Sequence, residues 1–127
     1  MERFTLKKEE RLCSHNVIGK LFSEGDSFFI FPFKVVFLIW NKEAPVFVQA
    51  AFAVPKKVCK RAVGRNALKR KMREAYRLNK QILYGVIKDF HVSVMFIYVG
   101  KEKKDAFKVP AILPKCMSKL AGIILSK

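Results

Sequence analysis

The sequence predicts an α+β fold, a single domain over residues 1–127 in which helices pack on one sheet. Three stretches, at 28–40, 46–54 and 91–99, are rich in Phe, Val and Ile, which is typical of strands. Segments with helical periodicity precede, separate and follow them. With 127 residues, 51% of them apolar, and neither a linker nor a repeat, the chain is long enough for one core of its own. The predicted architecture is therefore one α/β sandwich.

The first half of the chain is predicted to hold one helix and two strands. The helix ends before Gly25, a candidate stop signal. In the strand 28–40, whose start is loosened by Pro32, odd-numbered positions beyond this proline share one face and even-numbered positions share the other. Lys34 is a lone cation on the even-numbered face, so this end is exposed or the face is a groove for an anion. The short connection to 46–54 predicts an antiparallel hairpin.

The stretch 55–80 concentrates the charge, with eleven Lys or Arg residues and a single acid, Glu74. On a helix at about 100° per residue, one arc of about 140° collects cations and an amide. This arc holds Arg65, Asn66, Lys69, Arg70, Arg73, Arg77 and Lys80. The other side of the helix holds Leu68, Met72, Ala75, Leu78 and Ile82. Like charges four residues apart repel by roughly 0.2–0.5 kcal/mol per pair, so the cationic side either binds a polyanion or is a solvated face.

The last third is predicted to hold a central strand and a final helix. Residues 91–99 are nearly all apolar, which is typical of a strand covered on both faces. The tail 106–125 has helical spacing, and its prolines place the start of the regular helix near Pro110. Its apolar stripe is Leu113, Met117, Leu120 and Ile124. The predicted order is helix, strand, strand, basic helix, strand, helix.

Charge and composition limit the function. The net charge of +16 indicates an anionic partner, either nucleic acid or a membrane surface. No apolar stretch is long enough to span a bilayer, the N-terminus has no signal-peptide pattern, and three scattered cysteines indicate reduced thiols, so we expect a cytoplasmic protein. The acids are scattered, so we expect neither catalytic nor metal-ligating residues. An acid–base pair of His15 and His91 is the remaining alternative for hydrolysis.

The basic helix also carries a family resemblance. Arg65-Asn66-x-x-Lys69-Arg70-x-x-Arg73 resembles the signature of the bacterial ribonuclease P protein subunit. Upstream, Phe-Ala-Val-Pro-Lys-Lys at 52–57 and Ala-Val at 62–63 resemble the strand and turn that precede this helix in the family. One position departs, because the family usually has a third basic residue where this chain has Ala67.

The resemblance implies a function and adds detail to the fold. It implies a chain that binds the catalytic RNA subunit and the single-stranded 5′ leader of precursor tRNA, and so promotes endonucleolytic removal of the leader. The RNA subunit would carry the chemistry with Mg²⁺, held mainly by the RNA, with no obligate protein partner and no membrane. A short extra strand before the basic helix and a left-handed strand–helix–strand crossover are also implied, although right-handed crossovers are the general rule.

Two RNA-binding surfaces follow from the resemblance. The basic face would lie against folded RNA and contact mainly phosphates. It comprises Lys56, Lys57, Arg61, Arg65, Asn66, Lys69, Arg70 and Arg73. A cleft between the first helix and the sheet would hold the leader by stacking and apolar contact, with Ile18, Phe22 and Val36 as candidate walls. Ile18 and Val36 stand where the family has aromatic residues, and burial in the core would equally explain these apolar side chains.

Three other functions are consistent with the residues alone. Another structured-RNA-binding protein, such as a ribosomal protein or an RNA chaperone, would copurify with a different RNA. A free-standing cationic ribonuclease would cleave by itself and lose activity without His15 or His91. A DNA-binding module would prefer duplex DNA and place the basic helix in its major groove.

Overall fold

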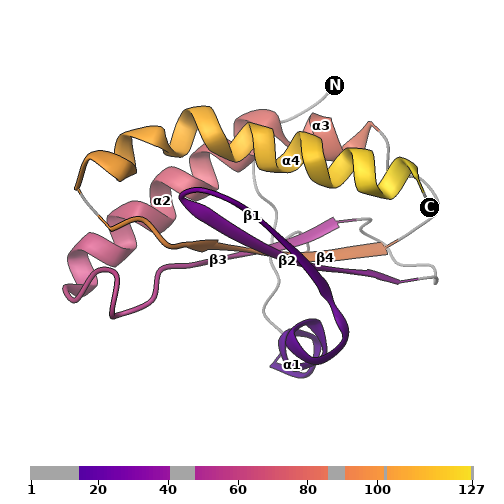
Figure 1. The fold of residues 1–127 in the computed structure, drawn as a ribbon, viewed down its shortest axis with the longest axis horizontal. Helices are drawn as coiled ribbons and strands as arrows, with labels where there is room; N and C mark the ends of the chain where they lie inside the picture. The colour runs from indigo at the N-terminus through magenta and orange to yellow at the C-terminus, as the bar shows by residue number, and fades with distance from the viewer. Residues whose placement is uncertain (1–14, 41–47, 86–90, 102, 127) are drawn as a thin grey trace.

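The structure is a computed structural model that describes residues 15–40, 48–85, 91–101 and 103–126. Four strands form one sheet, with α2, α3 and α4 on one face and α1 on the other (Figure 1). In chain order the elements are α1 (His15–Glu24), β1 (Asp26–Ile30), β2 (Phe33–Trp40), β3 (Val48–Ala53), α2 (Ala62–Asn79), α3 (Gln81–Tyr84), β4 (His91–Tyr98), the 3-10 helix η2 (Lys103–Lys108) and α4 (Val109–Leu125). This arrangement confirms the predicted α+β class.

The strand order β1-β2-β4-β3 places β4 inside the sheet, as its apolar sequence predicts. β2 pairs antiparallel with both β1 and β4, whereas β3 pairs parallel with β4. Parallel neighbours need a crossover connection, and α2 lies in the connection between β3 and β4. The strand–helix–strand unit implied by the resemblance is therefore present, and its left-handed sense stays a prediction.

Two predictions about the strands are wrong. The stretch 28–40 is two strands, because the chain turns at Phe31 and Pro32, joined by a cis peptide bond, and β1 folds back on β2. Proline has no N–H to donate to a sheet ladder, which favours a turn here. The short extra strand is thus β1, before β2, and not a strand before the basic helix. The predicted hairpin of 28–40 with 46–54 is absent, because β4 lies between β2 and β3.

Alternation along β2 separates two layers of core, as predicted. Phe33, Val35 and Phe37 are buried on the side of α2 and α4, together with most of the apolar residues of the sheet. Val36 is buried on the other side, beneath α1, with Leu21. The helix layer thus has the larger core, and α1 rests on a small one.

The final helix matches its predicted stripe. Leu113, Met117, Leu120 and Ile124 are all buried against the sheet and α2. The helix begins at Val109, so one proline lies in its first turn, and Pro114 lies inside the helix. Among the described residues, no helix is long and apolar enough to cross a membrane.

Gly25 ends α1 as predicted and fixes the helix against the sheet. Its N–H donates to the carbonyl oxygen of Leu21 at 2.9 Å. A Cβ at this position would lie 2.3 Å from the oxygen of Leu21 and 2.7 Å from that of Phe37. Only glycine allows this close approach, which sets the position of α1 over the sheet.

Candidate nucleic-acid interface

The rotation of α2 about its axis decides which of its cations face solvent. Met72, Ala75 and Tyr76 are buried, and Tyr76 lies on the side that helical spacing assigned to cations. Leu78, expected on the apolar side, is instead 52% exposed. The ring of Tyr76 packs on Phe52 and Phe96, so the buried stripe is turned toward Tyr76 and away from Leu78. Sequence spacing alone missed this because a tyrosine is equally common inside and at a surface.

The basic face is therefore divided into an outer part and an edge. Asn66, Arg70 and Arg73 are exposed, as are the cations of the preceding loop, Lys56, Lys57 and Arg61. Lys69 and Arg65 are half-buried at the border with the core. Lys80, also expected among the cations, is 8% exposed, and its ammonium nitrogen lies 5.5 Å from the ring centroid of Tyr84. The exposed part is what an RNA could reach.

Arg65 organises the loop that precedes α2. Its Nη1 donates to the carbonyl oxygens of Cys59, at 3.1 Å, and of Lys60, at 2.8 Å. Arg61 caps the helix with an extended backbone and no side-chain hydrogen bond. Arg65 thus holds the cation-rich loop against the helix, a role that the resemblance alone did not suggest.

Arg70 and Arg73 have no ion-pair partner among the described residues, so their charge is available to a ligand. With Glu74 and Arg77 they line a shallow hollow of about 170 Å³ on the outer side of α2. Glu74, the one acid of this stretch, pairs with Arg77. Three guanidinium groups around one neutralised acid form a surface that suits phosphate oxygens.

The predicted cleft residues divide between core and surface. Val36 is 5% exposed and lies in the small core under α1 with Leu21 and Met95. Ile18 is half-buried and packs against the same cluster. Phe22 is 56% exposed and is the one candidate wall of the three that a ligand could contact through most of its ring.

A row of residues beside α1 extends this surface, and sequence reasoning missed part of it. Phe29, Lys34, Ile97 and Ala53 are register partners across all four strands, on the face that carries α1. We call this set the open row. Phe29 is 57% exposed, Lys34 is exposed, and the other two are half-buried. A single strand over 28–40 does not predict the exposure of Phe29, which follows from the pairing of β1 with β2. Lys34 was expected either at an exposed end or in a groove for an anion. The structure places it on an exposed part of the sheet, where Phe29 is its register partner.

Candidate metal ligands and the histidines were the alternatives for hydrolysis. No group of three His, Cys, Asp or Glu within them lies together as a metal site. The side chains of His15 and His91 fall outside the described part of the chain, so the acid–base pair is not placed. What the described geometry supports is binding of an anion on α2 and contact with flat or apolar groups beside α1.

Comparison with known proteins decides between the kinds of binder. A family model described as Ribonuclease P matches residues 6–121. The chain belongs to the ribonuclease P protein family. The ribonuclease P protein component of Porphyromonas gingivalis (strain ATCC 33277) is 34% identical over 125 residues, covering 97% of this chain and 91% of that protein. The ribonuclease P protein component of Chlorobium phaeobacteroides is 36% identical over 111 residues, covering 78% of this chain and 75% of that protein.

Solved ribonuclease P proteins share the fold. The protein from Thermotoga maritima matches with a TM-score of 0.59 at 26% identity, over 93% of this chain and 97% of that one. A Staphylococcus aureus RNase P protein matches with a TM-score of 0.61 at 18% identity, over 90% and 94%, which supports the fold alone. Membership of the ribonuclease P family confirms the main interpretation of the sequence and implies an RNA subunit as partner.

Proposed function

We propose that this chain is the protein subunit of a ribonuclease P, which binds the catalytic RNA and the 5′ leader of precursor tRNA during 5′-end maturation. The observation that carries the proposal is the outer side of α2. Asn66, Arg70 and Arg73 are exposed there on a helix whose rotation is fixed by Tyr76. A rigid row of two cations and an amide on one side of a helix can meet the backbone of a folded RNA without reading its sequence.

The leader of precursor tRNA is assigned to the face that carries α1. Exposed rings at Phe22 and Phe29 can stack on unpaired bases, and the exposed cation Lys34, the register partner of Phe29, can meet a phosphate. Small residues at Ala51 and Ala53 keep the adjoining edge strand low on this face, because they extend little from the sheet. The proposal thus assigns the catalytic RNA to α2 and the leader of precursor tRNA to the face that carries α1.

The Mg²⁺ that the resemblance implies is assigned to the RNA subunit. Every charged side chain in the exposed part of the basic face is a cation, and cations repel a metal ion. The protein's own contribution is to reduce repulsion between two polyanions, which free Mg²⁺ otherwise screens. It should therefore act on substrate affinity and on the Mg²⁺ requirement.

Reconstitution tests the proposal. The purified chain is added to the catalytic RNA of the same organism, and cleavage of precursor tRNA is followed as Mg²⁺ is lowered. We expect the chain to extend cleavage to lower Mg²⁺, with RNA alone as control. No shift of the Mg²⁺ dependence would contradict the proposal, and copurification with a different RNA would favour a ribosomal or chaperone role.

A further inference from the structure

A cavity of about 360 Å³ lies between the start of α2 and η2. Its walls include Cys59, Gly64 and Leu68 on one side and Tyr98, Lys101 and Ala106 on the other. Leu68 is turned about 160° around the helix axis from Arg70, so the cavity opens on a flank of α2 that the basic face does not use. Neither the basic face nor the α1 surface includes it.

Two glycines keep this cavity open. A Cβ on Gly64 would lie 2.7 Å from the sulfur of Cys59, and one on Gly100 would lie 2.3 Å from the hydroxyl oxygen of Tyr98. Asp105 holds the neighbouring loop in place: one of its carboxylate oxygens accepts the N–H of Lys101 at 2.9 Å. Glycine at these two positions thus leaves room for the side chains of Cys59 and Tyr98, which form part of the walls.

The chemistry of the walls suits a flat, partly polar group. Leu68, Ala106 and the ring of Tyr98 are apolar, and the Tyr98 hydroxyl and Lys101 add polar groups. Burial, then the charge of Asp105, then Cys59 raise the pKa of Tyr98 above its usual value. This hydroxyl therefore keeps its proton at neutral pH and can donate a hydrogen bond.

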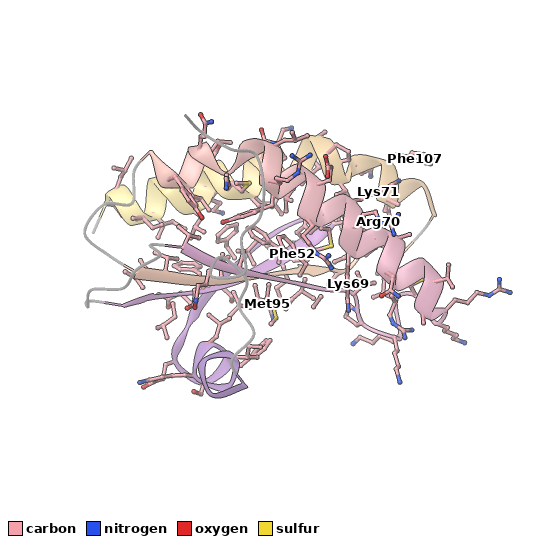
Figure 2. The ribbon with its side chains drawn as sticks, turned by 180° about the vertical axis from the view of Figure 1, so that it is seen from behind. Phe52, Lys69, Arg70, Lys71, Met95 and Phe107 are labelled. Carbon is pink, nitrogen blue, oxygen red and sulfur yellow. The ribbon has the colours of Figure 1, made fainter. Side chains whose placement is uncertain are left out.

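An aromatic ring and a cation come next to two wall residues of the cavity, Ala106 and Leu68. Phe107 directly follows Ala106 and is 77% exposed, and Lys71 lies one helical turn beyond Leu68. The ammonium nitrogen of Lys71 is 5.2 Å from the ring centroid of Phe107, and the two side chains lie close together in Figure 2. An exposed ring beside a cation is the pairing that binds a base and its phosphate in single strands.

We propose that this cavity receives one unstacked nucleobase of the RNA that lies across α2, with Phe107 stacking on the next base and Lys71 meeting the phosphate between them. Its volume is near the lower end of the range for small-molecule sites, about 300–1,000 Å³, so it suits one base and not a strand. Placing a single unpaired base in a pocket is a common way for proteins to recognise RNA. The inference rests on the proposed function, since it requires a bound RNA. The base comes either from the RNA subunit or from precursor tRNA.

The test fills the cavity and maps the RNA. Ala106→Phe adds a ring inside the cavity, and Ser118→Phe adds the same ring to the exposed side of α4 as a matched control. Complexes with the RNA subunit alone, and with precursor tRNA added, are probed with dimethyl sulfate and carbodiimide, which together report on all four bases. We expect one unpaired base that wild type and Ser118→Phe protect and Ala106→Phe does not. If the protection appears with the RNA subunit alone, the base belongs to that RNA. If it appears only after precursor tRNA is added, the base belongs to the precursor. The RNA affinity of Ala106→Phe should fall about 5- to 150-fold, the range for one base contact.

An abasic substitution at that nucleotide separates a pocket contact from a folding defect. Wild-type binding should weaken by the same factor, whereas Ala106→Phe should lose nothing further. Tyr98→Phe keeps the cavity volume, removes only the hydroxyl, and should weaken binding of the base-bearing RNA alone. Equal footprints for Ala106→Phe and Ser118→Phe, or equal abasic losses in all proteins, would overturn the proposal. In that case wild type would still reconstitute cleavage, whereas failure of the proposed function would abolish the effect of wild type itself.

Discussion

The ring of Tyr76 on α2 meets the ring of Phe52 on β3 edge to face, with 5.6 Å between the ring centroids and 69° between the planes. Phe52 in turn stacks on Phe96 of β4 at 5.7 Å. This group ties α2 to the two parallel strands that it connects. Figure 2 shows Phe52 on the helix side of the sheet, and Lys69 and Arg70 on the helix that this contact orients. The orientation of the basic face therefore depends on an aromatic contact in the core.

Truncation of Tyr76 should consequently affect both stability and RNA binding. Tyr76→Ala removes a fully buried ring, which typically costs about 3–5 kcal/mol of unfolding free energy. Urea unfolding measures this loss, and Tyr76→Phe, which keeps the ring, serves as the control. RNA affinity should fall with Tyr76→Ala and stay near wild type with Tyr76→Phe. A stable Tyr76→Ala protein would show that other contacts orient α2.

Gly25 offers a matched pair of substitutions within one region. Gly25→Ala forces a Cβ against two backbone oxygens and should destabilise the protein, because backbone cannot move aside cheaply. A Cβ at Gly19, inside the same helix, meets nothing within 4 Å, so Gly19→Ala should stabilise by about 0.5–1 kcal/mol through helix propensity. Thermal unfolding of the two variants should therefore shift in opposite directions. Equal shifts would mean that α1 tolerates displacement.

The sequence predicts local features of this fold better than long-range ones. Alternation correctly places Phe33 and Val36 on opposite faces, because strand period is a local property. Strand neighbours are set by distant contacts, so the pairing of β2 and β3 with β4 was beyond a local pattern. The strand pattern predicts only a loosened start at Pro32, whereas the chain turns there, so the pattern identifies neither β1 nor the exposed ring of Phe29. Helical spacing does not assign Tyr76 to the buried side, and the chemistry of tyrosine permits either environment.

The exposed part of the basic face, on α2 and on the loop before it, should produce a steep dependence of RNA binding on salt. If it neutralises about five phosphates, a plot of log affinity against log salt should have a slope near −4. Arg70→Ala should weaken binding and reduce the size of this slope by about one unit. Lys115→Ala removes an exposed cation from α4 instead and should leave the slope near the wild-type value. Identical slopes for the two variants would mean that Arg70 is ordinary solvated surface.

Phe22 and Val36 separate leader binding from folding. Phe22→Ala removes an exposed ring, so it should leave thermal stability unchanged while weakening binding of leader-bearing precursor by about 1–3 kcal/mol. Binding of mature tRNA, which lacks the leader, should hardly change. Val36→Ala should instead lower stability, because it leaves a cavity under α1. If Phe22→Ala weakened both RNAs equally in a less stable protein, the ring would belong to the core and not to the leader site.

The last prediction concerns what the protein does without its RNA. A chain with a net charge of +16 and exposed guanidinium groups, but no metal cluster within its described residues, should cleave nothing by itself. It should instead let an RNA enzyme work at lower Mg²⁺. Combined Arg70→Glu and Arg73→Glu should abolish reconstituted cleavage at low Mg²⁺, because the helix then repels the RNA. Raised Mg²⁺ should restore part of the activity, since the ion screens the same repulsion.

Two controls separate this mechanism from a protein nuclease. Reversal of the exposed cations Lys115 and Lys119 on α4 changes the net charge equally and should preserve cleavage, so position and not total charge is tested. The double variant His15→Ala and His91→Ala should cleave at nearly the wild-type rate in the reconstituted enzyme. A nuclease would behave differently, because an imidazole pair that transfers protons typically contributes 10²–10⁴-fold to the rate. Cleavage by rigorously RNA-free protein, lost in the double histidine variant, would therefore show that the chemistry resides in this chain.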